Sequence, residues 1–142
     1  MIHIILSIVL SCLFVVLATF HFYWFLGGKW GLKKVIPTVD KQSELPTIPR
    51  LATGLVALLL TLFGFVYLLE SEYLSFSVSS EILQWSSWFI TSLFIVRAIG
   101  EFKFIGLFKK INDTEFAKAD TWIFTPLCLI IALLGVLIHV LP

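Results

Sequence analysis

Charged residues are scarce in this chain, and their scarcity excludes an ordinary soluble domain. Only 13% of its 142 residues are Asp, Glu, Lys or Arg, whereas 59% are hydrophobic and the mean hydropathy is +1.02. Soluble domains carry about 25% charged residues. A chain of this length has too little interior to hide so much apolar surface from water, so we expect lipid to be the solvent for part of it.

Cysteine and the common catalytic motifs are also nearly absent. Cys12 and Cys128 lie within apolar runs, which predicts buried free thiols rather than a disulfide framework. No Cys/His spacing indicates a metal site, and the chain has no phosphate-binding glycine loop, HExxH or GxSxG motif. A haem held by His3 and His139 is disfavoured because both lie near the chain ends. We expect no metal and no cofactor.

Four apolar segments are present, and they predict four transmembrane helices. They cover about residues 4–26, 51–69, 83–102 and 121–141, each near the ~20 residues needed to cross ~30 Å of hydrocarbon. Backbone amides in lipid must be paired within their own segment, which favours helices. The first segment lacks a basic stretch before it and a small-residue cleavage site after it, so it is predicted to be a retained span.

The Lys and Arg residues predict the orientation of these helices. All ten lie in two loops or at their edges, around residues 27–50 and 103–120, with Arg97 just before the second loop. The turn between the second and third segments carries Glu70, Glu72 and Glu81 instead. Because basic loops stay in the cytoplasm, both termini are predicted to be extracytoplasmic. The fold class is therefore an all-α integral membrane antiparallel four-helix bundle, with residues 1–142 forming a single transmembrane domain.

Small residues recur at helical spacing on each apolar segment. Such faces let helices approach closely in lipid, where apolar side chains alone give no reason to associate. We expect the packing faces to contain Ser7, Ser11, Ala18, Gly54, Ala57, Thr61, Gly64, Ser87, Thr91, Ala132 and Gly135.

Residues 97–126 hold half of the Lys and Arg residues, and they contain several polar candidates for function. Arg97 and Glu101 are spaced i and i+4, which allows them to pair on one helix face. Charges at a membrane boundary are functional candidates, although a structural ion pair is the alternative. Asp120 is predicted to be the N-cap of the fourth helix. Pro126 predicts a kink near Trp122.

His21 completes the predicted site from the end of the first segment. It is expected at the depth of Arg97, Glu101 and Asp120, where it could relay protons or bind a ligand. A helix-packing histidine is the alternative. Tyr23 and Trp24 beside it could line a pocket or belong to the interfacial aromatic belt.

The basic inner loops are predicted to contact the membrane surface. Phe102, Phe104 and Phe108 alternate with Lys103, Lys109 and Lys110, which suits a loop lying on anionic headgroups. A basic, aromatic loop could also bind nucleic acid, but nothing else in the sequence supports that function. Residues 29–36 (KWGLKKVI) also resemble residues 103–111 (KFIGLFKKI), which suggests an internal hairpin repeat.

Two stretches, HFYWFLGGKWGL and RAIGEFKFIGLFKK…DTEFAKADTWIFTPLC, resemble the bacterial domain-of-unknown-function family 3995. The matching residues are His21, Tyr23, Trp24, Gly27, Gly28, Arg97, Gly100, Glu101, Asp120, Thr121 and Pro126. The resemblance covers essentially the whole chain. It implies a small multi-pass protein of the bacterial cytoplasmic membrane and carries no established activity. It also implies that these polar residues act together.

These observations favour a non-enzymatic membrane protein that binds or moves a small or lipidic ligand. Its inner-side site would be lined by His21, Tyr23, Trp24, Arg97, Glu101 and Asp120, in contact with membrane lipids. Four spans are few for a transporter monomer, so a transport role predicts a homodimer. The alternatives are a membrane enzyme acting on a lipid or isoprenoid, with His21 and Glu101 as acid and base, and a structural subunit of a larger membrane complex.

Overall fold

The computed structural model describes residues 1–41, 44, 46–47, 49–74 and 76–141, and every regular element in these residues is helical. Four continuous helices are long and apolar enough to cross a membrane, which indicates a multi-pass membrane protein and confirms the all-α class. The elements are α1 (Ile2–Phe25), α2 (Leu32–Val35), α3 (Arg50–Glu70), α4 (Ser80–Ile99), α5 (Glu115–Ala119), the π-helical turn η1 (Asp120–Phe124) and α6 (Thr125–Val140). The last three form one continuous helix, Glu115–Val140.

Several helix ends differ from the predicted boundaries by a few residues, and two of these differences have a clear structural cause. α4 stops at Ile99 because Gly100 takes φ +84°, a left-handed conformation that commonly ends helices. The fourth helix begins at Glu115, six residues before the apolar run, because the side chain of Thr114 accepts a hydrogen bond from the backbone N–H of Ala117 at 3.1 Å. Asp120 is therefore not the N-cap of this helix, and that prediction was wrong; Thr114 is the N-cap.

The chain divides into two compact units. The first unit contains residues 1–28, 48–91 and 133–142, and thus α1, α3, the first part of α4 and the last part of α6. The second unit contains residues 29–47 and 92–132, with α2, the end of α4, α5, η1 and the start of α6.

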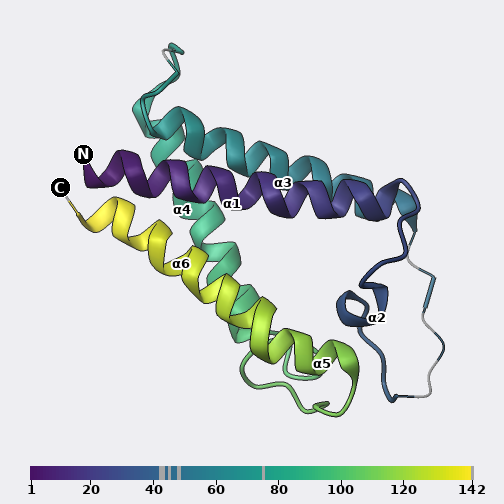
Figure 1. Ribbon diagram of the computed structural model, residues 1–142. Helices are drawn as coiled ribbons and strands as arrows, with labels where there is room; N and C mark the ends of the chain where they lie inside the picture. The colour runs from purple at the N-terminus through teal and green to yellow at the C-terminus, as the bar shows by residue number, and fades with distance from the viewer. Residues whose placement is uncertain (42–43, 45, 48, 75, 142) are drawn as a thin grey trace. The chain divides into compact units, whose positions relative to one another are not determined.

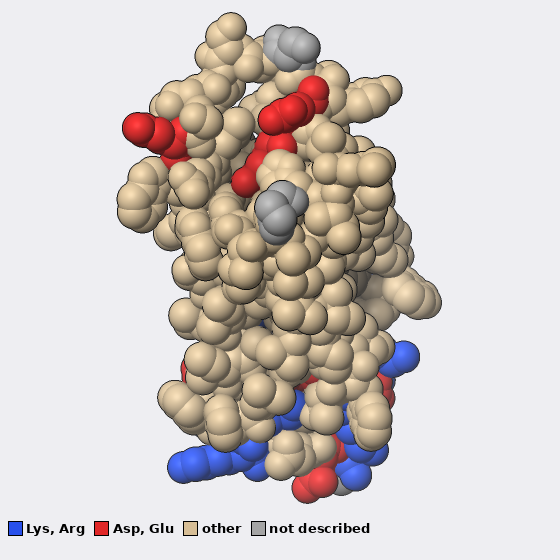
Figure 2. Space-filling model, turned by 90° about the vertical axis from the view of Figure 1, so that its left-hand side faces the viewer, with Lys and Arg blue, Asp and Glu red and all other residues tan. Residues whose placement is uncertain are grey.

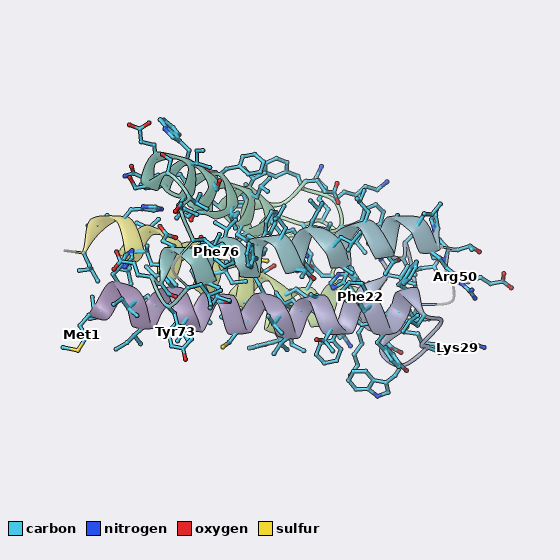
Figure 3. All side chains as sticks on the ribbon, turned by 90° about the horizontal axis from the view of Figure 1, so that it is seen from above. Met1, Phe22, Lys29, Arg50, Tyr73 and Phe76 are labelled. Atoms are coloured by element: carbon cyan, nitrogen blue, oxygen red, sulfur yellow. The ribbon has the colours of Figure 1, made fainter. Side chains whose placement is uncertain are left out.

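In the first unit, α1 and α3 lie side by side and run in opposite directions (Figures 1 and 3). Figure 3 shows Met1 at one end of this pair, and Phe22 and Arg50 toward the other. The Ser11 hydroxyl donates to the carbonyl of Gly64 at 2.8 Å, and a Cβ on Gly64 would lie only 3.3 Å from the Ser11 carbonyl oxygen. The predicted small faces thus bring two backbones into contact, as expected for helices in lipid.

The same principle brings α4 and α6 together within the first unit. A Cβ on Gly135 would collide with the hydroxyl of Thr91, so glycine is needed for this approach. Most of the predicted packing residues are buried, but Thr61 is exposed and donates to the carbonyl of Ala57 in its own helix. The prediction for Thr61 was therefore wrong.

Acidic residues flank the turn between α3 and α4. They are Glu70 at the end of α3, Glu72 in the turn and Glu81 in the first turn of α4. Acidic side chains are seen gathered on the face drawn in Figure 2.

In the second unit, α2 packs against α5, and the segment between α4 and α5 has no regular structure. The two loops that resemble each other in sequence therefore differ in conformation: residues 32–35 form α2, whereas residues 103–111 form turns and bends. The predicted distortion near Trp122 takes the form of the π-helical turn η1. Pro126 explains it, because proline has no N–H for the carbonyl of Trp122 and its ring crowds that turn.

Candidate functional site

Asp120 lies at the centre of a polar cluster in the second unit. Its side chain is completely buried and accepts four hydrogen bonds. The Arg97 guanidinium (Nη2) donates to Oδ1 at 2.9 Å. Oδ2 accepts from the backbone N–H of Gly106 at 2.9 Å, the Lys109 ammonium at 3.0 Å and the Thr125 hydroxyl at 3.1 Å. We call Arg97, Gly106, Lys109, Asp120 and Thr125 the Asp120 cluster.

The π-helical turn explains how one helix supplies two members of this cluster. In an α-helix, residues five apart do not lie above one another, but in a π-helical turn they do. The backbone N–H of Thr125 bonds to the carbonyl of Asp120 in this way, and the Thr125 side chain follows the same spacing to reach the Asp120 carboxylate. The distortion that Pro126 produces thus gives Asp120 a donor from its own helix.

The segment after α4 supplies the backbone donor. Gly100 and Gly106 take φ +84° and +91°, and their backbones pack directly against each other. A Cβ on Gly100 would collide with the carbonyl of Ile105, and one on Gly106 with the carbonyl of Ile99. The backbone N–H of Leu107 then bonds to Ala98 at 2.9 Å, which fixes the segment against the end of α4. Only glycine fits at both positions. The close packing of residues 105–106 against the end of α4 points the Gly106 N–H toward Asp120.

The cluster contains two cations and one anion. The Lys109 side chain is 4% exposed, and it also donates to the Thr121 hydroxyl at 2.6 Å. The Arg97 side chain is 32% exposed; its Nη1 is buried and has no hydrogen-bond partner in the described part of the chain. An unsatisfied buried donor of a charged group is costly, so this nitrogen is a candidate position for a further hydrogen-bond acceptor.

Two predictions about this stretch were wrong. The partner of Arg97 is Asp120, whereas the exposed Glu101 accepts from the backbone N–H of Phe104 at 2.6 Å. An i to i+4 pair requires a helix through both residues, and α4 ends at Ile99. Lys109, predicted to face headgroups, is instead bound to Asp120.

His21, Tyr23 and Trp24 belong to the first unit, on α1. The ring of His21 bonds through Nδ1 to the carbonyl of Leu17 at 2.8 Å and meets Trp24 edge-on with ring centroids 5.3 Å apart. Because a carbonyl oxygen can only accept, Nδ1 carries the hydrogen of this bond. Tyr23 is exposed, and its ring covers Gly28.

A hollow of about 580 Å³ lies elsewhere in the second unit. It is lined by Val39, Asp40, Lys41, Lys110, Ile111, Asn112 and Asp113. None of the six predicted site residues lines it, and its charged residues are of both signs. It therefore offers no charge selectivity for an anionic ligand.

Sequence reasoning missed a second polar cluster, in the first unit. It joins Tyr67 and Glu70 of α3, Ser87 and Thr91 of α4, and His139 of α6. From the sequence, Ser87 and Thr91 were predicted only to be small packing residues, and Glu70 only to belong to an acidic turn. The available signal was the presence of polar side chains within apolar spans.

Comparison with known proteins places the chain in a family. It belongs to the family described as "Protein of unknown function (DUF3995)", whose model matches residues 14–135, and this confirms the resemblance seen in the sequence. The match includes the whole Asp120 cluster. No curated protein and no solved structure matches the chain.

Proposed function

We propose that this member of the family binds the phosphate group of an anionic lipid at the Asp120 cluster. The observation that supports it is the buried, unpartnered Nη1 of Arg97 beside an excess of positive charge. Asp120 neutralises only one of the two cations around it. A guanidinium presents its donors as a fork, so Asp120 occupies one arm and leaves the other for a phosphate oxygen.

We further propose that this site lies at the cytoplasmic leaflet of a bacterial cytoplasmic membrane, with both termini outside. The support is the confinement of all Lys and Arg residues to two loops and their edges. Anionic lipids attract such basic segments, at about 1 kcal/mol for each Lys or Arg near the surface. Phe102 and Phe108 are exposed in the second loop, where they would insert below the headgroups.

Replacing Arg97 with Lys tests lipid binding directly. Lysine keeps a cation for Asp120 but has no second arm for a phosphate. Loss of one hydrogen bond between charged groups costs about 1.5–3 kcal/mol, or roughly a ten- to hundredfold weaker association. Mass spectrometry of the purified protein should therefore show phosphatidylglycerol retained by the wild type and lost from Arg97→Lys.

Lys110→Ala is the matched control, because it removes an exposed cation next to Lys109 but outside the Asp120 cluster. It should retain the lipid. Equal loss from both variants would show that the loop attracts lipid only by its overall charge. Equal retention in both would contradict the site and favour a structural subunit. Conversion of the bound lipid by the purified protein would favour the alternative of a lipid-modifying enzyme.

The orientation has its own test. A cysteine placed at Glu72, in the turn after α3, should react with a membrane-impermeant maleimide on intact cells. A cysteine placed at Lys110 should react only after the membrane is permeabilised. The background should be a variant in which Cys12 and Cys128, both free thiols, are replaced by Ala. The reverse pattern of labelling would place the basic loops outside.

A further inference from the structure

Glu70, Ser87 and His139 form a continuous hydrogen-bonded chain across three helices of the first unit. The Ser87 side chain is completely buried and occupies the middle. Its Oγ lies 3.1 Å from Oε1 of Glu70 and 2.9 Å from Nε2 of His139. We call these three residues the Glu70 chain.

The order of the groups distinguishes this chain from a nucleophilic triad. In a hydrolase, histidine lies between the nucleophile and the carboxylate, so that it can take the proton of the serine and be held by the acid. Here serine lies between the other two. A serine hydroxyl has one hydrogen and can accept another, so it can pass a proton from one neighbour to the other. The geometry fits proton transfer rather than attack by Ser87.

The Glu70 carboxylate provides a second observation. Oε2 is buried and has no hydrogen-bond partner among the residues that the structure describes. A buried ionised carboxylate is stable only when its oxygens are hydrogen-bonded or paired with cations. Ser87 satisfies Oε1 only. A proton on the carboxyl group would remove this unpaired charge.

We propose that the Glu70 chain is a proton-binding site in which one proton is exchanged between His139 and Glu70 through Ser87. In the transfer, the His139 imidazolium gives the proton on Nε2 to Ser87 Oγ. The hydroxyl hydrogen of Ser87 passes at the same time to Oε1 of Glu70. The products are neutral imidazole, an unchanged serine and a neutral carboxylic acid, and the reverse transfer restores the starting state. His139, half-buried in the last turn of α6, is the entry point for the proton.

Other titratable groups lie near the Glu70 chain but are not part of the proton path from His139 to Glu70. His3 of α1 interacts electrostatically with His139. The Tyr67 hydroxyl of α3 lies 3.3 Å from Oγ1 of Thr91 and donates to the Ser87 carbonyl at 3.4 Å. On α4, Glu81 is exposed. From α6, the His139 ring stacks on Trp88 with centroids 4.4 Å apart, which holds the imidazole in place.

Infrared spectroscopy of the full chain in lipid tests the proposal. The wild type should show the carbonyl band of a protonated carboxylic acid, which Glu70→Gln removes and Glu81→Gln preserves. After a jump into D2O this band shifts as the proton is replaced. A positioned proton-transfer group contributes roughly 10²–10⁴-fold to a rate. Ser87→Ala should therefore slow the shift by about a hundredfold or more.

Ser86→Ala is the control, because the adjacent Ser86 is half-buried and its hydroxyl donates to the carbonyl of Ile82 in its own helix, outside the Glu70 chain. Its exchange rate should match the wild type. The proposal is wrong if the wild type shows no protonated-carboxyl band at any pH at which it is folded, or if the band survives in Glu70→Gln. It is also wrong if Ser87→Ala exchanges as fast as Ser86→Ala. The wild-type measurement requires no variant to fold.

Discussion

Asp120→Asn should be the most destabilising substitution of a polar side chain in the second unit, at about 3–5 kcal/mol. The asparagine has nearly the same shape, so the loss comes from charge rather than packing. It leaves the Lys109 ammonium, 4% exposed, and the Arg97 guanidinium without a counter-ion. Thermal unfolding of the purified protein in detergent should show the loss. Asp113→Asn, at an exposed position seven residues earlier, should unfold like the wild type.

A second substitution separates this explanation from a general defect. If the cost in Asp120→Asn is that of unpaired cations, removing one cation should recover part of it. Lys109→Met in the Asp120→Asn background should therefore be more stable than Asp120→Asn alone, although Lys109→Met in the wild type is destabilising. The coupling free energy from this cycle is expected to reach about 1–3 kcal/mol. Additive effects of the two substitutions would show that Asp120 and Lys109 do not interact.

The four spans could be predicted because they depend on composition and local pattern. Apolar runs of sufficient length predict helices in lipid whatever their neighbours. The contacts of the site could not be predicted in the same way. Glu101 was assigned to Arg97 by helical spacing, but Gly100 ends the helix between them. The helical turn from Glu115 to Ala119 is too polar to be recognised from hydropathy, so the predicted start of the fourth helix was too late in the sequence.

The Glu70 chain was missed for a different reason. Its members are far apart in the sequence, with Ser87 and His139 separated by 52 residues. Each has a plausible local role, as a turn acid, a small packing residue or a terminal histidine. Only the packing of α3, α4 and α6 in the first unit shows that they touch. Which residues meet across two helices depends on how each helix is rotated about its own axis. A helix that is apolar on all sides gives no sequence signal for that rotation.

Gly100→Ala should lower the stability of the second unit by about 3 kcal/mol and abolish lipid retention. Two costs add here. A left-handed conformation costs a residue with a Cβ about 1–2 kcal/mol. The new methyl group also collides with the backbone carbonyl of Ile105, and such overpacking costs about 1–3 kcal/mol. Relief requires residues 105–106 to move, which withdraws the Gly106 N–H from Asp120.

Two glycines at the end of α1 separate these costs. Gly27 has φ +99° but no clash at its Cβ position, where the nearest atom, Nη2 of Arg50, is in ordinary van der Waals contact at 3.8 Å. Gly27→Ala should therefore show the conformational cost alone. Gly28 has the opposite character, because the three atoms nearest its Cβ position all belong to the ring of the exposed Tyr23, a side chain that would have to rotate away. Gly28→Ala should be nearly neutral.

Thermal unfolding should thus rank the variants as Gly100→Ala, then Gly27→Ala, then Gly28→Ala in order of decreasing damage. Lipid retention should fall in the first alone, since only Gly100 shapes the segment that reaches Asp120. If Gly100→Ala lost stability but kept its lipid, the Asp120 cluster would be a structural brace and the phosphate would bind elsewhere. If Gly27→Ala matched Gly100→Ala in stability, the backbone contact between Gly100 and Ile105 would contribute nothing, and the positive φ would be the whole constraint.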